Sequence, residues 1–380
     1  NNHELLDLDV RKPGQAYWYP FQIAFLLMSI RGLAFKQHSD NSTADLLWFP
    51  TGGGKTEAYL AVASFAMILR RLEGMVEDGL GVSVLMRYTL RLLTLQQFER
   101  ASTLMCALEH LRRNLRNGIL GKKPFLLGMW VGYSLTPNHW QSSKQALLDL
   151  KTNPNASPAD GSPCQTNYCP WCGKNMNPQD NYKFDSQTKW TLVRCSNEKQ
   201  GCPFSDSSFS SDKILPLVTV DSDIYSRCPS MIISTVDKFA RMPFRSEIAN
   251  IFGHAHRKCE LHGFLPHTKE SSFNCQMTGI GQHRTKHQVC DLPDKLLPPD
   301  LIIQDELHLI SGSLGTMVGL YETAVDFLTT RSDKDGKKIR PKIIVSTATA
   351  KGSEKQVRKI FNRTKTQTFP PPGIEQKDSF

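Results

Sequence analysis

Two short segments far apart in the chain hold the residue types that bind and hydrolyse a nucleoside triphosphate. The first, residues 50–56, reads Pro-Thr-Gly-Gly-Gly-Lys-Thr. Glycines let backbone N–H groups turn toward phosphate oxygens, a lysine can reach the β- and γ-phosphates, and a threonine hydroxyl can bind Mg²⁺. The longer phosphate-loop pattern requires glycine where this chain has Phe49, so only the shorter Thr-Gly-x-Gly-Lys-Thr form fits. The expected ligands of ATP and Mg²⁺ are Thr51, Gly52, Gly53, Gly54, Lys55 and Thr56.

The second segment is an apolar run, residues 301–304, that ends in two carboxylates. Asp305 can hold Mg²⁺ directly or through water, and Glu306 can polarise the attacking water. An Asp-Glu pair at a strand end is common and carries little weight alone. Ligands of open α/β sheets bind at the carboxyl ends of the strands, so this segment should face the phosphate loop. The expected catalytic residues are Lys55, Asp305 and Glu306.

Alternating strands and helices must position these segments. Short apolar runs are expected to be strands at residues 46–49, 82–86, 125–131, 231–233, 301–303 and 343–345. Helices are expected at residues 21–36, 57–72 and 92–115. Continuous apolar strands that alternate with helices indicate an α/β fold, with a parallel sheet covered by helices on both faces.

In this order the motifs resemble those of superfamily 2 helicases. The phosphate loop, the Asp-Glu-Leu-His box and residues 346–349 are similar to motifs I, II and III, and residues 89–97 and 234–238 are similar to motifs Ia and Ib. Gln22 resembles the adenine-reading glutamine of a Q motif. The resemblance implies the first RecA-like P-loop domain of a helicase or translocase. It also implies that ATP state is coupled to domain movement through His308, Ser346, Thr347 and Thr349.

The resemblance extends to the helicase subunit of the DISARM antiphage system. Residues 301–312, 314–316, 319–322 and 369–373 carry it. It implies a role in bacterial antiphage defence and a partner subunit in a defence complex. Nothing after Thr349 resembles motifs IV to VI, so a second RecA-like domain is expected in the full-length protein. Without its arginine finger, typically worth ~10³–10⁵ in rate, this chain should hydrolyse ATP weakly.

A nucleic-acid partner is expected from charge and from the resemblance. The chain has 380 residues and a formal net charge of +10, which favours an anionic partner but also fits a merely solubilising surface. The motif resemblance implies a grip on the backbone of one strand, with single-stranded DNA favoured, through phosphate donors rather than base-reading groups. These donors would be Arg87, Thr89, Arg91, Thr94, Gln96, Thr235 and Lys238. For residues 89–97 an ordinary amphipathic helix is the alternative.

Ten cysteines, clustered in short pairs, favour metal binding in a reducing compartment over a secreted disulfide framework, so a cytoplasmic location is expected. Cys169 and Cys172 form a zinc knuckle, and Cys195 and Cys202 follow at the outer spacing of a zinc ribbon. Six residues separate the second pair, which is longer than usual, so Cys164 is an alternative ligand. Four thiolates would close the coordination of Zn²⁺ and make its role structural.

A second insertion, rich in His and Cys, spans residues 254–290. Cys259 and His262 have ligand spacing, but no clean second pair follows, so a polar basic loop is favoured over a second zinc. The expected organisation is a RecA-like core in three parts (1–150, 213–253 and 296–380, the last including an exit linker), a Cys-rich zinc-binding insertion (151–212) and the His/Cys-rich insertion (254–295).

Three other functions remain open on sequence alone. An RNA helicase would share every motif. The resemblance at motifs Ia and III argues against a non-motor P-loop enzyme, such as a small-molecule kinase, because such an enzyme does not need these motifs. A zinc-dependent nucleic-acid binding module with a vestigial ATPase fits poorly with intact Lys55, Thr56, Asp305 and Glu306. No apolar run reaches the ~18 residues that a membrane span needs, so no membrane partner is expected.

Overall fold

The structure is a computed structural model. It describes residues 17–48, 54–74, 80–115, 118–210, 213–266, 275, 288–292, 296–348 and 352–371. Over these ranges, a search for helices with the length and hydropathy of a membrane span finds none.

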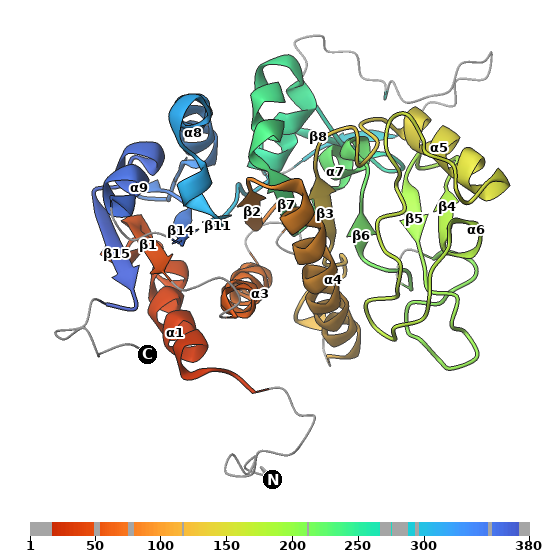
Figure 1. Cartoon of the computed structure of the whole chain (residues 1–380), viewed down its shortest axis with the longest axis horizontal. Coiled ribbons are helices and arrows are strands. Elements are labelled where there is room, and N and C mark those ends of the chain that lie inside the picture. Colours follow the sequence, from red (N-terminus) through yellow and green to blue (C-terminus); the bar gives the residue numbers. More distant parts are fainter. Residues whose placement is uncertain are drawn as a thin grey trace, which may run out of the picture.

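One parallel sheet of eight strands organises the described part of the chain (Figure 1). From edge to edge the order is β15-β1-β14-β11-β2-β7-β3-β6, and every neighbouring pair is parallel. The strands are β1 (Thr43–Trp48), β2 (Val84–Tyr88), β3 (Leu127–Trp130), β6 (Leu217–Val218), β7 (Met231–Thr235), β11 (Leu301–Gln304), β14 (Lys342–Thr347) and β15 (Lys365–Phe369). Because all strands run the same way, their carboxyl ends meet at one edge of the sheet.

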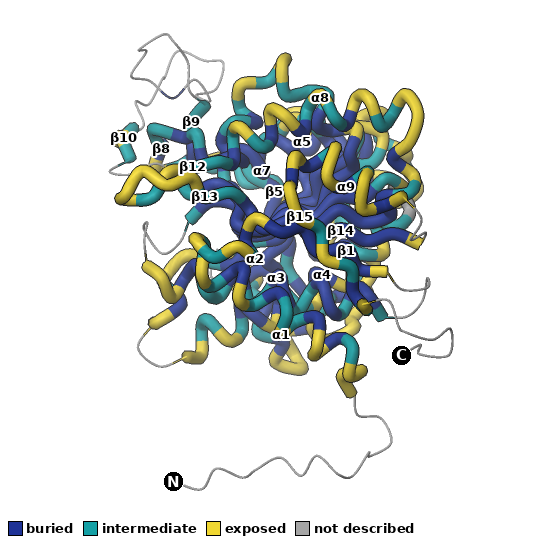
Figure 2. The backbone as a smooth tube through the Cα atoms, turned by 90° about the vertical axis from the view of Figure 1, so that its left-hand side faces the viewer, coloured by how far each residue is buried: buried dark blue, intermediate teal, exposed yellow. Residues whose placement is uncertain are grey.

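Helices cover both faces of this sheet, as Figures 1 and 2 show. One face carries α1 (Pro20–Ala34), α3 (Lys55–Glu73) and α4 (Arg91–Asn114), and the other carries α7 (Asp221–Arg227), η2 (Val236–Phe244), η3 (Ser246–Phe252), α8 (Gly312–Thr329) and α9 (Ser353–Phe361). Successive strand residues enter opposite cores: Leu47 and Met86 pack in the first, Leu46 and Leu85 in the second. Burial on both faces explains why these strands read as continuous apolar runs.

Smaller elements are inserted between the strands of the main sheet. The Cys-rich insertion contains α6 (Pro178–Asn181) and a two-stranded antiparallel sheet, and α5 (Trp140–Thr152) precedes it. Its strands are β4 (Tyr182–Phe184) and β5 (Thr191–Val193). A three-stranded antiparallel sheet, β10-β8-β9, lies in the His/Cys-rich segment. Its strands are β8 (Arg257–Cys259), β9 (Gly263–Leu265) and β10 (Val289–Asp291), and the other short elements are α2 (Ser39–Ser42), η4 (Leu307–Leu309), β12 (Arg331–Ser332) and β13 (Lys338–Ile339).

The fold class expected from sequence is confirmed. The six expected strands are β1, β2, β3, β7, β11 and β14, and the three expected helices are α1, α3 and α4. Each agrees within two residues at either end, except that β1 begins three residues earlier than expected. The chain is an α/β domain of the RecA-like P-loop class with a Cys-rich insertion. The expected division into five segments remains a prediction.

Candidate functional site

The phosphate loop joins β1 to the start of α3. Thr51, Gly52 and Gly53 lie outside the described residues. Gly54 is the N-cap of α3 and has a left-handed backbone, with φ of 81°. Lys55 and Thr56 follow in the first turn of α3, 7% and 8% exposed. The N-terminus of a helix presents unsatisfied N–H groups and the positive end of the helix dipole, so this turn is suited to hold phosphate oxygens.

Gln22, on α1, is fixed against this loop. Its Nε2 donates a hydrogen bond to the Gly54 carbonyl at 2.9 Å, and its Oε1 accepts one from the Tyr19 N–H at 2.9 Å. A Cβ atom at position 54 would lie 2.8 Å from Gln22 Nε2, so this contact requires glycine as much as the backbone angle does. The contact of Gln22 with adenine stays a prediction.

The acidic pair follows β11. Asp305 and Glu306 are 7% and 8% exposed. The Glu306 N–H donates to Asp305 Oδ1 at 2.9 Å, and the Ser346 hydroxyl, on β14, donates to the same carboxylate oxygen. Glu306 has a φ of 52°, which is left-handed for a residue with a side chain. Such strain persists where the surrounding structure holds it, often at functional sites.

The order of strands brings the two segments together. β14 pairs with both β1 and β11, so the phosphate loop and the acidic pair leave the sheet at the same edge, one strand apart. Tyr59, on α3, also connects them. Burial first, and the negative charge of Asp305 next, hold the pKa of its phenol well above the ordinary value. The start of α3 and the carboxylates therefore lie at the same edge of the sheet.

Two of the expected coupling residues lie between the acidic pair and the end of β14. His308 Nδ1 is 3.3 Å from Glu306 Oε2 and accepts a hydrogen bond from the Ala348 N–H at 3.5 Å. Ser346 contacts Asp305, as described above. Thr347 is fully buried on β14, and Thr349 lies outside the described residues. A displacement of Glu306 would therefore move His308 and, through it, the backbone at Ala348, which follows β14.

This site fits magnesium and ATP by the chemistry of its groups. Lys55 and the first turn of α3 can neutralise phosphate charge, while Thr56 and Asp305 offer the hard oxygen ligands that Mg²⁺ prefers. Bound Mg²⁺ would screen the charge that develops on the phosphates. The carboxylate of Glu306 lies at the same edge of the sheet and can accept a proton from water.

Arg87 does not occupy the position expected of a phosphate contact. It is 1% exposed and forms an ion pair with Glu322, on α8. Its guanidinium also lies over the Phe239 and Phe361 rings, at 5.3 and 5.6 Å from their centroids. The side chain is part of the core on the α8 face, so it has no surface to offer a nucleic acid in this arrangement.

Lys238 is buried in the same way. Its ammonium lies 2.6 Å from Asp221 Oδ2 and donates to the Val131 carbonyl at 2.6 Å. It ties the ends of β7, β3 and β6 together from within. Thr94 and Thr235 are also fully buried, and the Thr94 hydroxyl donates to the Leu90 carbonyl at 2.9 Å.

The remaining expected contacts lie at the carboxyl end of β2. Gln96 is exposed on the first turns of α4, whereas Thr89 is partly exposed but its hydroxyl oxygen is buried. Arg91 is the first residue of α4, although its side chain lies outside the described part of the chain. Of the seven sequence candidates, Arg91 and Gln96 are the ones whose positions fit contact with a strand that crosses this edge.

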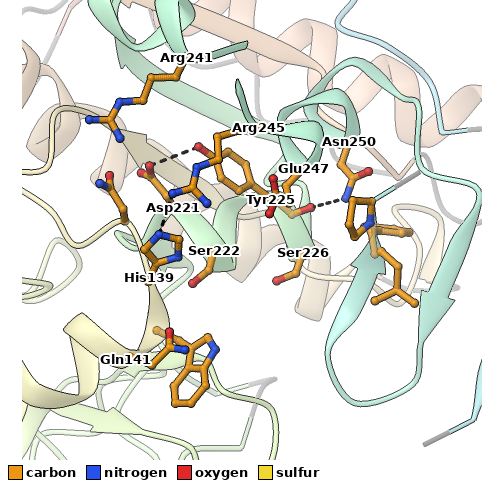
Figure 3. Close-up of a pocket in the computed structure, with 15 residues that line it drawn as sticks. His139, Gln141, Asp221, Ser222, Tyr225, Ser226, Arg241, Arg245, Glu247 and Asn250 are labelled. Atoms are coloured by element: carbon orange, nitrogen blue, oxygen red, sulfur yellow. Dashed lines mark hydrogen bonds between the residues drawn. The ribbon is translucent and has the colours of Figure 1, made fainter. Parts of the chain in front are cut away.

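A pocket of about 160 Å³ lies beside the carboxyl ends of β3, β6 and β7 (Figure 3). Arg241, Arg245 and His139 surround Asp221 in this pocket. The Arg245 guanidinium lies 3.0 Å from His139 Nε2, and burial, then the charge of Arg245, lower the pKa of His139. The volume is below the ~300 Å³ of a typical small-molecule site and suits one charged group of a larger ligand. Sequence reasoning missed these residues, although two arginines four apart directly after motif Ib were a usable signal.

The four predicted zinc ligands form a cluster. The Sγ atoms of Cys169, Cys172, Cys195 and Cys202 lie within 4.8 Å of one another. Zn–S distances of about 2.3 Å in a tetrahedron separate the sulfurs by about 3.8 Å, and the Cys172 and Cys195 sulfurs are 3.6 Å apart. Burial raises the pKa of the Cys172 thiol, but N–H donors from Lys174 and Asn197 outweigh it and lower the pKa to about 7. The cluster fits a structural Zn²⁺, and Cys164 is not in it.

The cysteine cluster packs against α4. The Trp171 ring lies 4.7 Å from the His110 ring, and the Arg113 guanidinium lies 4.7 Å over Phe204. Arg113 also donates to the Pro203 carbonyl at 3.2 Å. These contacts connect the Cys-rich insertion to the helix that begins at Arg91.

The fold and the site define the class of protein: a RecA-like P-loop domain that carries a zinc-ribbon-like insertion. No family model matches the chain. The chain is 38% identical over 392 residues to the DISARM protein DrmA of Bacillus paralicheniformis, and the match covers 100% of this chain and 33% of that protein. The chain thus spans about a third of this relative, and the resemblance to a DISARM protein is confirmed over its whole length.

Two solved structures are also similar to this chain. Both are crystal structures of the DUF1998 helicase MrfA, and the second is bound to DNA. The TM-scores are 0.41 and 0.40 at 10% and 11% identity, over 93% and 94% of this chain and 30% and 28% of those chains.

Proposed function

We propose that this chain is the ATP-binding motor domain of a superfamily 2 helicase or translocase that moves along single-stranded DNA in antiphage defence. One observation carries the proposal: the phosphate-loop residues, the acidic pair and the residues between them share one edge of a parallel sheet. The similarity to a DISARM protein supports the defence role. The cofactors are ATP with Mg²⁺, and the insertion holds Zn²⁺.

The two halves of the sheet edge divide the work. The ends of β1, β14 and β11 hold the nucleotide, and the ends of β2, β7 and β3 face the nucleic acid. The halves meet where β11 pairs with β2, and the Asp305 N–H donates to the Arg87 carbonyl at 3.0 Å. Thr89 follows two residues later. A movement of Asp305 caused by a change at the γ-phosphate would therefore be transmitted through one hydrogen bond to Arg87. From Arg87 it would pass along two residues of backbone to the nucleic-acid side.

The grip on the strand is made by surface donors. Arg91 and Gln96, in the first turns of α4, contact phosphates, and Arg241 and Arg245 extend the track across the pocket of Figure 3. These groups recognise the backbone rather than the bases, so binding tolerates any sequence. Arg87, Thr94, Thr235 and Lys238 act from the interior by holding the strand ends in place.

The ATP site is tested by two substitutions in the full-length protein. Lys55→Ala should abolish nucleotide binding, because the cation that neutralises the β- and γ-phosphates is lost. Glu306→Gln should bind ATP like the wild type and lose hydrolysis by roughly 10²-fold or more, since general base catalysis is removed. Binding is measured with a fluorescent ATP analogue and hydrolysis by phosphate release. Normal turnover by Glu306→Gln would show that another group activates the water.

The same experiment separates the alternative functions. A zinc-dependent binding module with a vestigial ATPase would bind ATP weakly and would be unaffected by either substitution. A non-motor P-loop enzyme would hydrolyse or transfer phosphate without a response to nucleic acid. Competition between single-stranded DNA and RNA of one sequence distinguishes a DNA motor from an RNA motor.

A further inference from the structure

A second cluster of metal-ligand residues lies in the His/Cys-rich segment. Cys259, His262 and Cys275 are 0%, 1% and 3% exposed, and one ligand atom from each lies within 4.8 Å of the others. His262 Nδ1 is 3.5 Å from Cys259 Sγ and 3.1 Å from Cys275 Sγ. We propose that these three residues bind a second Zn²⁺, independent of the Cys169 cluster and of the nucleotide site.

The three ligand atoms are close enough together for one zinc ion to reach them all. Zn–S and Zn–N distances of about 2.3 and 2.0–2.1 Å in a tetrahedron place sulfur and nitrogen about 3.6 Å apart. The Nδ1 atom of one buried imidazole lies beside two buried cysteine sulfurs. Two thiolates and one imidazole are a ligand set that Zn²⁺ prefers.

The backbone repeats the geometry of the first zinc knuckle. Cys169 and Cys172 are followed by Gly173, with φ of 72°, and Cys259 and His262 are followed by Gly263, with φ of 82°. In each case the glycine closes a tight turn that aims two ligand side chains at one point. In the second knuckle this turn joins β8 to β9, where Cys259 pairs with Gly263. The pattern Cys-x-x-(Cys or His)-Gly thus recurs in both insertions.

The turn is also built into the packing of the core. A Cβ atom at position 263 would lie 2.1 Å from the Ser226 carbonyl oxygen, on α7. The hairpin is therefore pressed against α7, and Phe264, the next residue, lines the pocket of Figure 3. A metal bound at Cys259 and His262 would fix this hairpin, and Cys275 would fasten a distant point of the chain to it.

Cys290 offers a matched control within the same small sheet. It lies on β10 opposite Lys258, whereas Val289 lies opposite Cys259. Side chains alternate between faces along a strand, so Cys290 points to the other face from Cys259. It is exposed, and no ligand atom of Cys290 joins the cluster among the described residues. Three protein ligands leave one coordination position for a further donor.

Zinc content of the full-length protein, purified without chelators, tests this site. Cys259→Ser should lower the content by about one ion per chain relative to the wild type, and Cys169→Ser should do the same at the other cluster. The double variant should lose about two ions, and Cys290→Ser should lose none. Equal zinc in Cys259→Ser and wild type, with the Cys169 cluster intact, would overturn the proposal, as would zinc loss in Cys290→Ser.

A ligand exchange keeps the test valid if Cys259→Ser fails to fold. In His262→Cys a third thiolate replaces the imidazole, so the metal should remain bound. After Co²⁺ replaces zinc, the sulfur-to-metal charge-transfer absorption of His262→Cys should exceed that of the wild type by about one thiolate. An unchanged spectrum would show that His262 is not a ligand.

Discussion

Arg87 and Lys238 each face a buried carboxylate instead of solvent. Their sequence positions, inside helicase-like motifs, suggested phosphate contacts, because a motif records residue type and spacing but not the direction of the side chain. Removing one partner of a buried ion pair typically costs about 3–5 kcal/mol, because the other charge stays uncompensated. A loss of nucleic-acid binding in Arg87→Ala or Lys238→Ala would therefore report damage to the fold.

Arg91→Ala should weaken binding of single-stranded DNA without damage to the fold. If Arg91 contacts one phosphate, its loss should flatten the slope of log affinity against log salt by about 0.7 for single strands, equally for all sequences. The measurement is a fluorescence titration at several salt concentrations. Lys337→Ala, on the exposed β12–β13 hairpin, is the control. Equal losses in both variants would mean diffuse electrostatic attraction rather than a track at α4.

Asp223 should make stability depend on pH. Burial raises its pKa from 3.8 to about 7, against the N–H of Thr191, which donates to the carboxylate at 2.8 Å. A raised pKa means that the folded state favours the neutral acid, so its stabilising contribution is complete below about pH 4. It is lost as pH rises to about 7, by roughly 1.4 kcal/mol per pH unit.

Asp223→Asn, which stays neutral, should flatten this dependence. The pKa of Asp45 and that of Asp221 are also raised by burial, in each case to about 6, so the comparison is clearest between pH 6 and 7. Urea unfolding at several pH values measures it, with Asp335→Asn as the exposed control. A wild-type slope that persists in Asp223→Asn would mean that Asp223 is ionised in the folded protein.

At the scale of elements, the positions of strands and flanking helices along the chain were predictable from sequence. Which strands lie side by side in the sheet was not. Apolar runs such as residues 343–345 identify a buried strand, and the knuckle spacing identified Cys169 and Cys172. Sequence could not show that β14 lies between β1 and β11, since strand order depends on crossovers far apart in the chain. Nor could it show that Cys275, with no partner pair nearby, lies beside His262.

The zinc proposed for the Cys-rich insertion should stabilise α4. Cys169→Ser should lose about one zinc ion and lower the unfolding temperature, because Trp171 and Phe204 pack on α4 from the cluster. Elemental analysis and calorimetry measure the two effects. Cys164→Ser is the control, since Cys164 is not part of the cluster. Full zinc retention in Cys169→Ser would show that other residues bind the metal.

At the scale of the whole molecule, we propose that one sheet edge serves two ligands. The nucleotide half and the nucleic-acid half are joined at β11 and β2, through the hydrogen bond from Asp305 to the Arg87 carbonyl. The chain spans about a third of its DISARM relative, and we expect a second RecA-like domain to supply the arginine that completes the site. That domain would then stimulate ATP hydrolysis at a site whose other groups, the start of α3 and the acidic pair, lie at one edge of this sheet.

The rate of ATP hydrolysis by the full-length protein, with and without single-stranded DNA, tests this account most directly. Phosphate release is measured at saturating ATP and Mg²⁺, with Glu306→Gln as the background. We expect the DNA to raise the wild-type rate of ATP hydrolysis several-fold and to leave the rate of Glu306→Gln unchanged. The reason is that DNA bound at the ends of β2, β7 and β3 would affect the acidic pair through the contact between β2 and β11. A wild-type rate that is the same with and without nucleic acid would contradict the assignment as a motor domain.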